Sequence, residues 1–134
     1  MNHNHVGAIA AGLLVFLGIS RQASREKCLW LADKCIHMRI FPDENDKLNL
    51  SVIQSGRAVL VVSQFTLWAE ATKGNRPSFS LAADTNTALP LYHLFIERLK
   101  EYGLQVEQGE FGAMMQVELI NDGPVTIWLE APGE

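Results

Sequence analysis

The longest apolar run of the chain, residues 8–19, places the tightest limit on what it can fold into. It is about half as long as a membrane-spanning helix and contains Gly12 and Gly18. Its glycines and β-branched residues also disfavour a soluble helix. We therefore expect a short strand, a turn at Ala11 and Gly12, and a buried strand over residues 13–17, with no membrane span.

The size and charge of the chain limit it further. It has 134 residues, 48% apolar and 19% charged, which predicts one folded domain over residues 1–134 and excludes intrinsic disorder. The net charge is −4. A protein that binds a long stretch of nucleic-acid backbone usually carries excess positive charge, so we expect any nucleic-acid contact to be small and local.

The two cysteines, Cys28 and Cys35, are seven residues apart in a segment with helical periodicity. On one helix face their Cα atoms would be about 10 Å apart, too far for a disulfide. Residues 1–5 also lack the positive charge that begins a signal peptide. We therefore expect free thiols and a cytoplasmic protein.

Two helices and about six strands are predicted. Ser24 is a suitable N-cap for the first helix, and the second begins between Asp84 and Thr87 and stops at Gly103. The other expected features are a polar turn at 42–47 and strands at 58–67, 104–108, 115–120 and 125–129. Because this order shows no βαβ alternation, we expect an α+β fold with two main helices and a mostly antiparallel, β-barrel-like sheet.

The sequence contains no conventional catalytic motif. It has no nucleophile elbow, phosphate-binding loop, dinucleotide-binding turn or His-Glu-x-x-His pair. His3 and His5 would share one side of an extended segment and form either half of a metal site or a frayed terminus. His37 and His93 fall in the predicted helices. We therefore expect neither a metal nor an organic cofactor.

Three segments need an explanation. Residues 63–67 (SQFTL) place two hydroxyls and an amide at the end of the most apolar strand, either as caps or as a site. Residues 73–79 (KGNRPSF) put two cations on a loop, either solvated or ligand-binding. Residues 121–126 (NDGPVT) look like a hairpin turn, but a proline after Asp-Gly cannot donate to the ladder.

Together these segments are far more specific than any one of them. With residues 111–115 (FGAMM), 12–18 (GLLVFLG), 39–41 (RIF) and 47–50 (KLNL), they resemble the D-aminoacyl-tRNA deacylase family over residues 6–129. Members of that family usually begin with a further strand and hairpin, including an arginine that helps to hold the active-site loop. The given sequence starts inside that hairpin, and we expect a misplaced start codon rather than a barrel without one edge.

The resemblance implies a homodimeric, β-barrel-like enzyme of the cytoplasm. It would hydrolyse the ester between a D-amino acid, or glycine, and the 3′-terminal adenosine of tRNA, releasing free tRNA in a proofreading reaction. No metal or cofactor takes part. Two alternatives stay open: a related deacylase with a trans Gly-Pro bond that accepts a small L-amino acid, and a dimeric barrel that binds a nucleotide or D-amino acid without turnover.

The resemblance also implies the site residues. Backbone N–H groups within Ser63, Gln64, Phe65 and Thr66 would stabilise the oxyanion, while the substrate's own ribose hydroxyl assists. Thr66 as a nucleophile is the alternative. The remaining implied residues are a cis Gly123-Pro124 peptide that enters the partner's pocket, an adenine slot of Phe111, Ala113 and Met115, and Lys73 and Arg76 as phosphate contacts.

Overall fold

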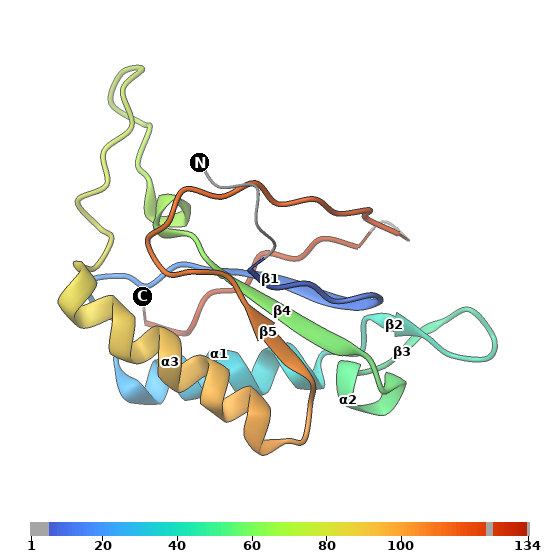
Figure 1. Cartoon of the computed structure of the whole chain (residues 1–134). Helices are drawn as coiled ribbons and strands as arrows, with labels where there is room; N and C mark the ends of the chain where they lie inside the picture. Colours follow the sequence, from blue (N-terminus) through green and yellow to red (C-terminus); the bar gives the residue numbers. More distant parts are fainter. Residues whose placement is uncertain (1–5, 123–124, 134) are drawn as a thin grey trace.

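The computed structural model describes residues 6–122 and 125–133 (Figure 1). The two expected main helices are present, the first with its expected cap and the second starting within the expected range. Ser24 Oγ accepts a hydrogen bond from Lys27 N–H at 3.2 Å at the start of α1 (Arg25–His37). Asp84 accepts one from Thr87 N–H at 2.9 Å at the start of α3 (Thr85–Glu101). Past the end of α3, Gly103 has a φ of 80°, a left-handed conformation that glycine adopts without strain.

The largest sheet of the described residues is parallel, so the expectation of a mostly antiparallel sheet is wrong. Its strands β1 (Gly12–Leu17), β4 (Ala58–Ser63) and β5 (Val106–Gln108) lie in the order β1-β4-β5, and both pairs run parallel. The central strand β4 is the one with the nearly unbroken apolar sequence. Such a sequence is typical of a parallel strand covered on both faces.

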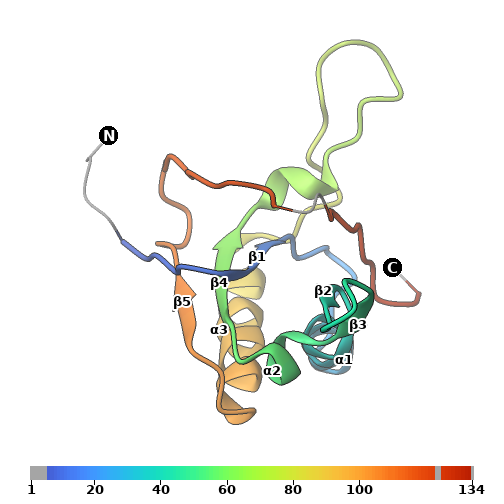
Figure 2. The ribbon, with the colours of Figure 1, turned by 90° about the vertical axis from the view of Figure 1, so that its right-hand side faces the viewer.

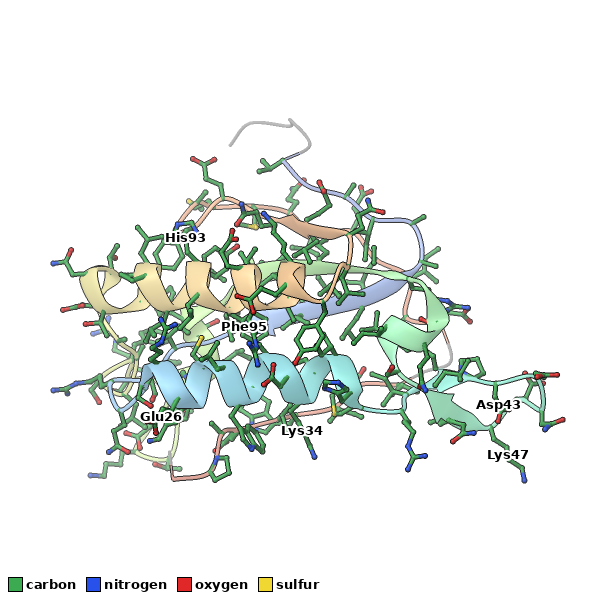
Figure 3. The ribbon with its side chains drawn as sticks, turned by 90° about the horizontal axis from the view of Figure 1, so that it is seen from below. Glu26, Lys34, Asp43, Lys47, His93 and Phe95 are labelled. Atoms are coloured by element: carbon green, nitrogen blue, oxygen red, sulfur yellow. The ribbon has the colours of Figure 1, made fainter. Side chains whose placement is uncertain are left out.

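The two main helices are the crossover connections that parallel strands require. Both lie on the same face of the sheet (Figures 1 and 2), and their contact fills the core. Figure 3 shows Phe95 between the helices, whereas Lys34 points away from α3. The buried core includes Ala32, Ile36, Val59, Val61, Phe95, Ile96 and Leu99.

A small hairpin and a short helix connect α1 to β4. Strands β2 (Phe41–Pro42) and β3 (Leu48–Leu50) are antiparallel and enclose the expected polar turn. In that turn the Asp43 carboxylate accepts the N–H groups of Asn45 and Lys47. Helix α2 (Val52–Ser55) then begins with a capping box between Ser51 and Gln54.

The last third of the chain departs most from expectation. After β5 it continues in two extended legs, 111–121 and 125–130, on the far side of the sheet from the helices (Figure 1), and neither leg is a strand. The strands expected at 115–120 and 125–129 are therefore wrong, as is the short one before residue 11. Extended segments become strands only where a neighbouring edge pairs with them, and no closed barrel forms in the described residues. Within the same residues, no helix is long and apolar enough to cross a membrane.

Candidate active site

The three parallel strands bring distant segments together at one edge of the sheet. Leu17 at the end of β1 pairs with Ser63 at the end of β4, and Gln108 at the end of β5 pairs with Val61. In parallel sheets, ligands commonly bind beyond the carboxyl ends of the strands. This edge therefore positions the 63–66 segment beside the chain that follows β5.

A sharp turn follows β4. The Gln64 N–H donates to the Leu17 carbonyl at 2.8 Å, and the chain then enters a 3₁₀ helix, η1 (Phe65–Trp68). Gly18 packs directly beneath: an added Cβ would lie 3.0 Å from the Gln64 carbonyl oxygen and 3.0 Å from Leu67 Cβ. The turn keeps its place because residue 18 has no side chain.

The first two backbone N–H groups of η1 are free to donate. Within the described part of the chain, the N–H groups of Phe65 and Thr66 have no hydrogen-bond acceptor, as expected for the first donors of a helical turn. Both residues are exposed. The Gln64 side-chain amide donates to Thr66 Oγ1 and so occupies one lone pair of that hydroxyl. The turn thus presents two backbone donors and an oriented hydroxyl.

The chain after β5 meets this turn from the other side. The Gly109 N–H donates to the Val61 carbonyl at 3.1 Å, and the Met115 sulfur lies 3.2 Å from where a Gly109 Cβ would be. Phe111 is half-buried against the core. The structure therefore brings Phe111 and Met115 to the same sheet edge as Ser63, whereas Ala113 is exposed.

Sequence reasoning did not identify Tyr92 as part of this arrangement. It is buried on α3, and its hydroxyl donates towards the carbonyls of Val61 at 3.3 Å and Gly109 at 3.5 Å. Its ring packs against Phe111 with centroids 5.3 Å apart. Burial raises the pKa of the Tyr92 hydroxyl, which keeps it a donor. A tyrosine on the buried face of a helix needs a hydrogen-bond partner for its hydroxyl, and this requirement is the sequence signal that could have identified Tyr92.

The loop expected to carry phosphate contacts projects from the body as an arm (Figures 1 and 2). Glu70 and Ser78 close it with two backbone hydrogen bonds of 2.7 and 2.8 Å. Lys73 and Arg76 lie on the exposed part of this arm and are not brought against residues 63–66. Phe79, which was not expected in the site, contacts the Phe65 ring.

The Gly123-Pro124 bond lies outside the described residues, and so do His3 and His5. Next to that bond, the Asn121 side-chain amide donates to Thr126 Oγ1 at 3.0 Å, which joins the two extended legs.

The described residues offer little for nucleophilic or metal chemistry. No three of their His, Cys, Asp or Glu side chains are grouped to hold a metal ion. Cys35 is a free thiol, as the helical spacing predicted. The buried Cys28 thiol donates to the Leu91 carbonyl at 3.2 Å. Burial raises the pKa of the Cys35 thiol to about 11, so it carries no reactive thiolate at neutral pH.

Comparisons with known proteins agree with the motifs. The chain is 54% identical over 125 residues to a D-aminoacyl-tRNA deacylase of Proteus mirabilis, covering 93% of this chain and 86% of that one. It is 53% identical over 126 residues to a D-aminoacyl-tRNA deacylase of Thermotoga petrophila, covering 94% and 85%.

Solved structures give the same fold. A chain described as c-Myc DNA Unwinding Element Binding Protein superposes with a TM-score of 0.85 at 41% identity, covering 92% of this chain and 85% of that one. A probable eukaryotic D-amino acid tRNA deacylase superposes with a TM-score of 0.64 at 15% identity, covering 76% and 75%, and supports the α+β fold alone.

A family model described as D-Tyr-tRNA(Tyr) deacylase matches residues 1–130. With relatives above 50% identity over most of its length and the same fold in solved structures, the chain belongs to the D-Tyr-tRNA(Tyr) deacylase family.

Proposed function

We propose that this chain hydrolyses the ester bond between a D-amino acid and the 3′-terminal adenosine of tRNA, releasing free tRNA and the D-amino acid. Membership of the deacylase family, at above 50% identity to two curated members, carries this proposal. The geometry adds two backbone donors for an oxyanion and the half-buried Phe111 ring at the same edge of the sheet. The reaction removes mischarged D-amino acids, and non-cognate glycine, from tRNA in the cytoplasm.

The two free N–H groups of Phe65 and Thr66 are the centre of the mechanism. When water attacks the ester carbonyl, negative charge develops on its oxygen, and preorganised backbone donors stabilise that charge. An aminoacyl ester is already activated, so orientation and two donors suffice. The turn that supplies them is fixed by the Gln64 to Leu17 hydrogen bond beneath it.

As the bond between the acyl carbon and the ribose oxygen breaks, the proton of the attacking water passes to that departing ribose oxygen rather than to a protein base. In this proposal the neighbouring ribose hydroxyl of the terminal adenosine orients the water. Thr66 as a nucleophile is less favoured, because its Oγ1 already accepts from Gln64 and no basic side chain among the described residues contacts it. Ser63 and Gln64 shape the turn, and Gln64 orients the Thr66 hydroxyl.

The terminal adenine binds against Phe111, Ala113 and Met115, in a small apolar slot suited to a flat base. Phe111 and Met115 lie beside the end of β4, which supports this placement. Lys73 and Arg76 contact the phosphates of the acceptor end. These contacts are few, as expected for a chain of net charge −4.

Chirality is selected by a backbone wall from a second copy of the chain. In this proposal the Gly123-Pro124 peptide is cis and enters the partner's pocket, where its carbonyls leave no room for an L side chain. A backbone wall cannot rotate away, so it rejects by exclusion. The active species is then a two-fold homodimer with two shared sites.

Exposed apolar side chains on the extended legs support a dimer. Ile120 is 94% exposed and Met114 is 84% exposed, and both lie on the leg that leads to residue 123. Leu119, Ile127 and Trp128 are also exposed on the two legs. Large exposed apolar patches usually mark interaction surfaces.

One of the solved relatives is described as a protein that binds a DNA unwinding element. We do not extend duplex binding to this chain, since it has no basic surplus. Two other candidates remain: a deacylase with a trans Gly-Pro bond, which would accept a small L-amino acid, and a dimer that binds without turnover.

The test is to incubate the chain with D-Tyr-tRNA and L-Tyr-tRNA and to follow deacylation. The proposal predicts rapid loss of the D ester and little change in the L ester. Rapid loss of a small L-aminoacyl ester would instead favour the trans alternative. Binding of both esters without turnover would contradict the enzyme and favour the binding module.

A further inference from the structure

Two phenylalanine rings meet on the surface beside the proposed oxyanion donors. Phe65 begins η1, and Phe79 lies at the base of the projecting arm. Their ring centroids are 5.2 Å apart with planes at 66°, an edge-to-face pair. Phe65 is 55% exposed and Phe79 is 41% exposed. Phenylalanine side chains are usually buried, so two half-exposed rings in contact with each other need an explanation.

The arm that carries Phe79 is anchored to the body near these rings. The Arg21 guanidinium donates to the Ser80 carbonyl at 3.2 Å, and the Arg21 N–H donates to the Leu81 carbonyl at 2.9 Å. Glu70 and Ser78 pair across the arm. Phe79 is therefore held over Phe65 by backbone contacts on both sides of it.

Cations extend from the rings along the same arm. Lys73 and Arg76 are exposed, and neither forms an ion pair within the part of the chain that the structure describes. In a chain of net charge −4, an arm that carries two unpaired cations further out than a pair of exposed aromatic rings at its base is a local exception. Aromatic rings flanked by cations are typical of surfaces that bind single-stranded nucleic acid.

We propose that the Phe65–Phe79 pair stacks the unpaired base that precedes the terminal adenosine, while Lys73 and Arg76 contact the phosphates leading to it. This proposal rests on the proposed function and deepens it, because it assigns a second base subsite on the RNA. The occupant is single-stranded RNA, since a purely apolar partner would gain nothing from the arm's cations. Stacking also tolerates any base, so this subsite adds affinity without sequence preference.

The test compares two substrates with one variant. D-Tyr-tRNA contains the preceding nucleotides, whereas the D-tyrosyl ester of adenosine does not. In Phe79→Leu the side chain stays apolar but loses its ring, so we expect the ratio of kcat/KM for the tRNA ester to that for the adenosine ester to fall about fivefold or more. The change should lie in KM. Phe79→Trp, which keeps a ring, should retain the ratio.

Leu81→Ala is the matched control. Leu81 is 41% exposed, as Phe79 is, and lies two residues further along the same segment. It has no ring to stack on a base, so the ratio should stay at the wild-type value. Thermal unfolding of each variant checks that the fold is retained.

Three results would overturn the proposal. An unchanged ratio in Phe79→Leu removes the subsite. An equal fall for both esters assigns the rings to the amino-acid side chain or to support of the turn. Dissociation of a wild-type dimer by Phe79→Leu, seen by sedimentation, assigns the rings to contact with a second copy.

Failure of the proposed function is read separately. If the wild-type chain hydrolyses neither ester, the hydrolase proposal falls. The subsite is then tested by comparing the affinity for the trinucleotide CpCpA with the affinity for adenosine alone. Weaker binding of CpCpA by Phe79→Leu, with adenosine binding retained, would support it. Equal binding of CpCpA by both proteins would overturn it.

Discussion

Substitution of Gly18 by alanine tests how the proposed oxyanion donors are held. A Cβ at this position would lie 3.0 Å from the Gln64 carbonyl oxygen, 3.0 Å from Leu67 Cβ and 3.1 Å from Trp68 Cδ1. These separations are tighter than nine in ten real Cβ contacts, so the turn must shift by a few tenths of an ångström. The Gln64 carbonyl and the Phe65 N–H belong to one planar peptide unit. Displacing the carbonyl therefore displaces the first oxyanion donor.

The size of the effect follows from this geometry. Overpacking costs about 1–3 kcal/mol in stability. Because the added Cβ would be only slightly too close to its neighbours, we expect the free energy of unfolding to fall by about 1 kcal/mol. Loss of a whole oxyanion donor costs about 10²–10³ in kcat, so its partial displacement should cost about tenfold. The measurements are kcat and KM on D-Tyr-tRNA well below the unfolding temperature, with the free energy of unfolding in urea.

Gly56→Ala provides a control with similar loss of stability. Gly56 caps α2 with a φ of 68°, and an added Cβ there meets nothing within 4 Å. Alanine in this left-handed conformation costs about 1–2 kcal/mol, but the site is not touched. We expect Gly56→Ala to retain the wild-type kcat. A wild-type kcat in Gly18→Ala, or an equal loss in both variants, would refute the reasoning.

The remaining predictions concern other parts of the account. Thr66→Ala should lower kcat only a few-fold without an acyl-enzyme, and a trapped aminoacyl-Thr66 seen by mass spectrometry would restore the nucleophile model. Excess EDTA should leave the deacylation rate unchanged, and a loss restored by zinc would contradict the metal-free mechanism. Pro124→Ala should lower the ratio of D- to L-aminoacyl-tRNA hydrolysis, because a cis bond before alanine costs about 2.5–4 kcal/mol; an unchanged ratio would exclude chiral selection by this bond. Hydrogen bonds, first from Arg98 and then from Tyr102, hold the pKa of Asp33 below its usual value. The stability that these bonds add to the fold is therefore complete above the usual aspartate pKa, and it is lost as the pH falls through the lowered pKa of Asp33. Between about pH 5 and pH 2, the unfolding temperature of the wild type should thus fall more steeply than that of Asp33→Asn, and parallel curves would contradict this.

Local signals in the sequence predicted the helices well. Ser24 caps the first helix as predicted, the second begins within the predicted range with Asp84 as its cap, and it stops before Gly103. Capping depends on residues within one turn of each other, so it is readable from sequence. The 63–66 turn was found for a related reason, because polar groups interrupt an apolar strand there.

Pairing between strands was not readable in the same way. The direction of β1 beside β4 depends on the crossover through α1, and the expectation of antiparallel pairing ignored the apolar run in β4. The alternating residues after 111 predicted strands, but a strand also needs a paired edge. Tyr92 and Phe79 were missed because their roles depend on contacts with Gly109 and Phe65, which are distant in sequence.

The most direct measurement of the central claim is the backbone amide spectrum of the turn with a bound substrate analogue. The probe is D-tyrosine joined to adenosine through an amide in place of the ester, which resists hydrolysis. If the N–H groups of Phe65 and Thr66 donate to the substrate carbonyl, their proton resonances should shift downfield and their hydrogen exchange should slow on titration, whereas the amide of Gly56 should not change. Saturation of the protein with the analogue while both amides keep their free shifts and exchange rates would contradict the account.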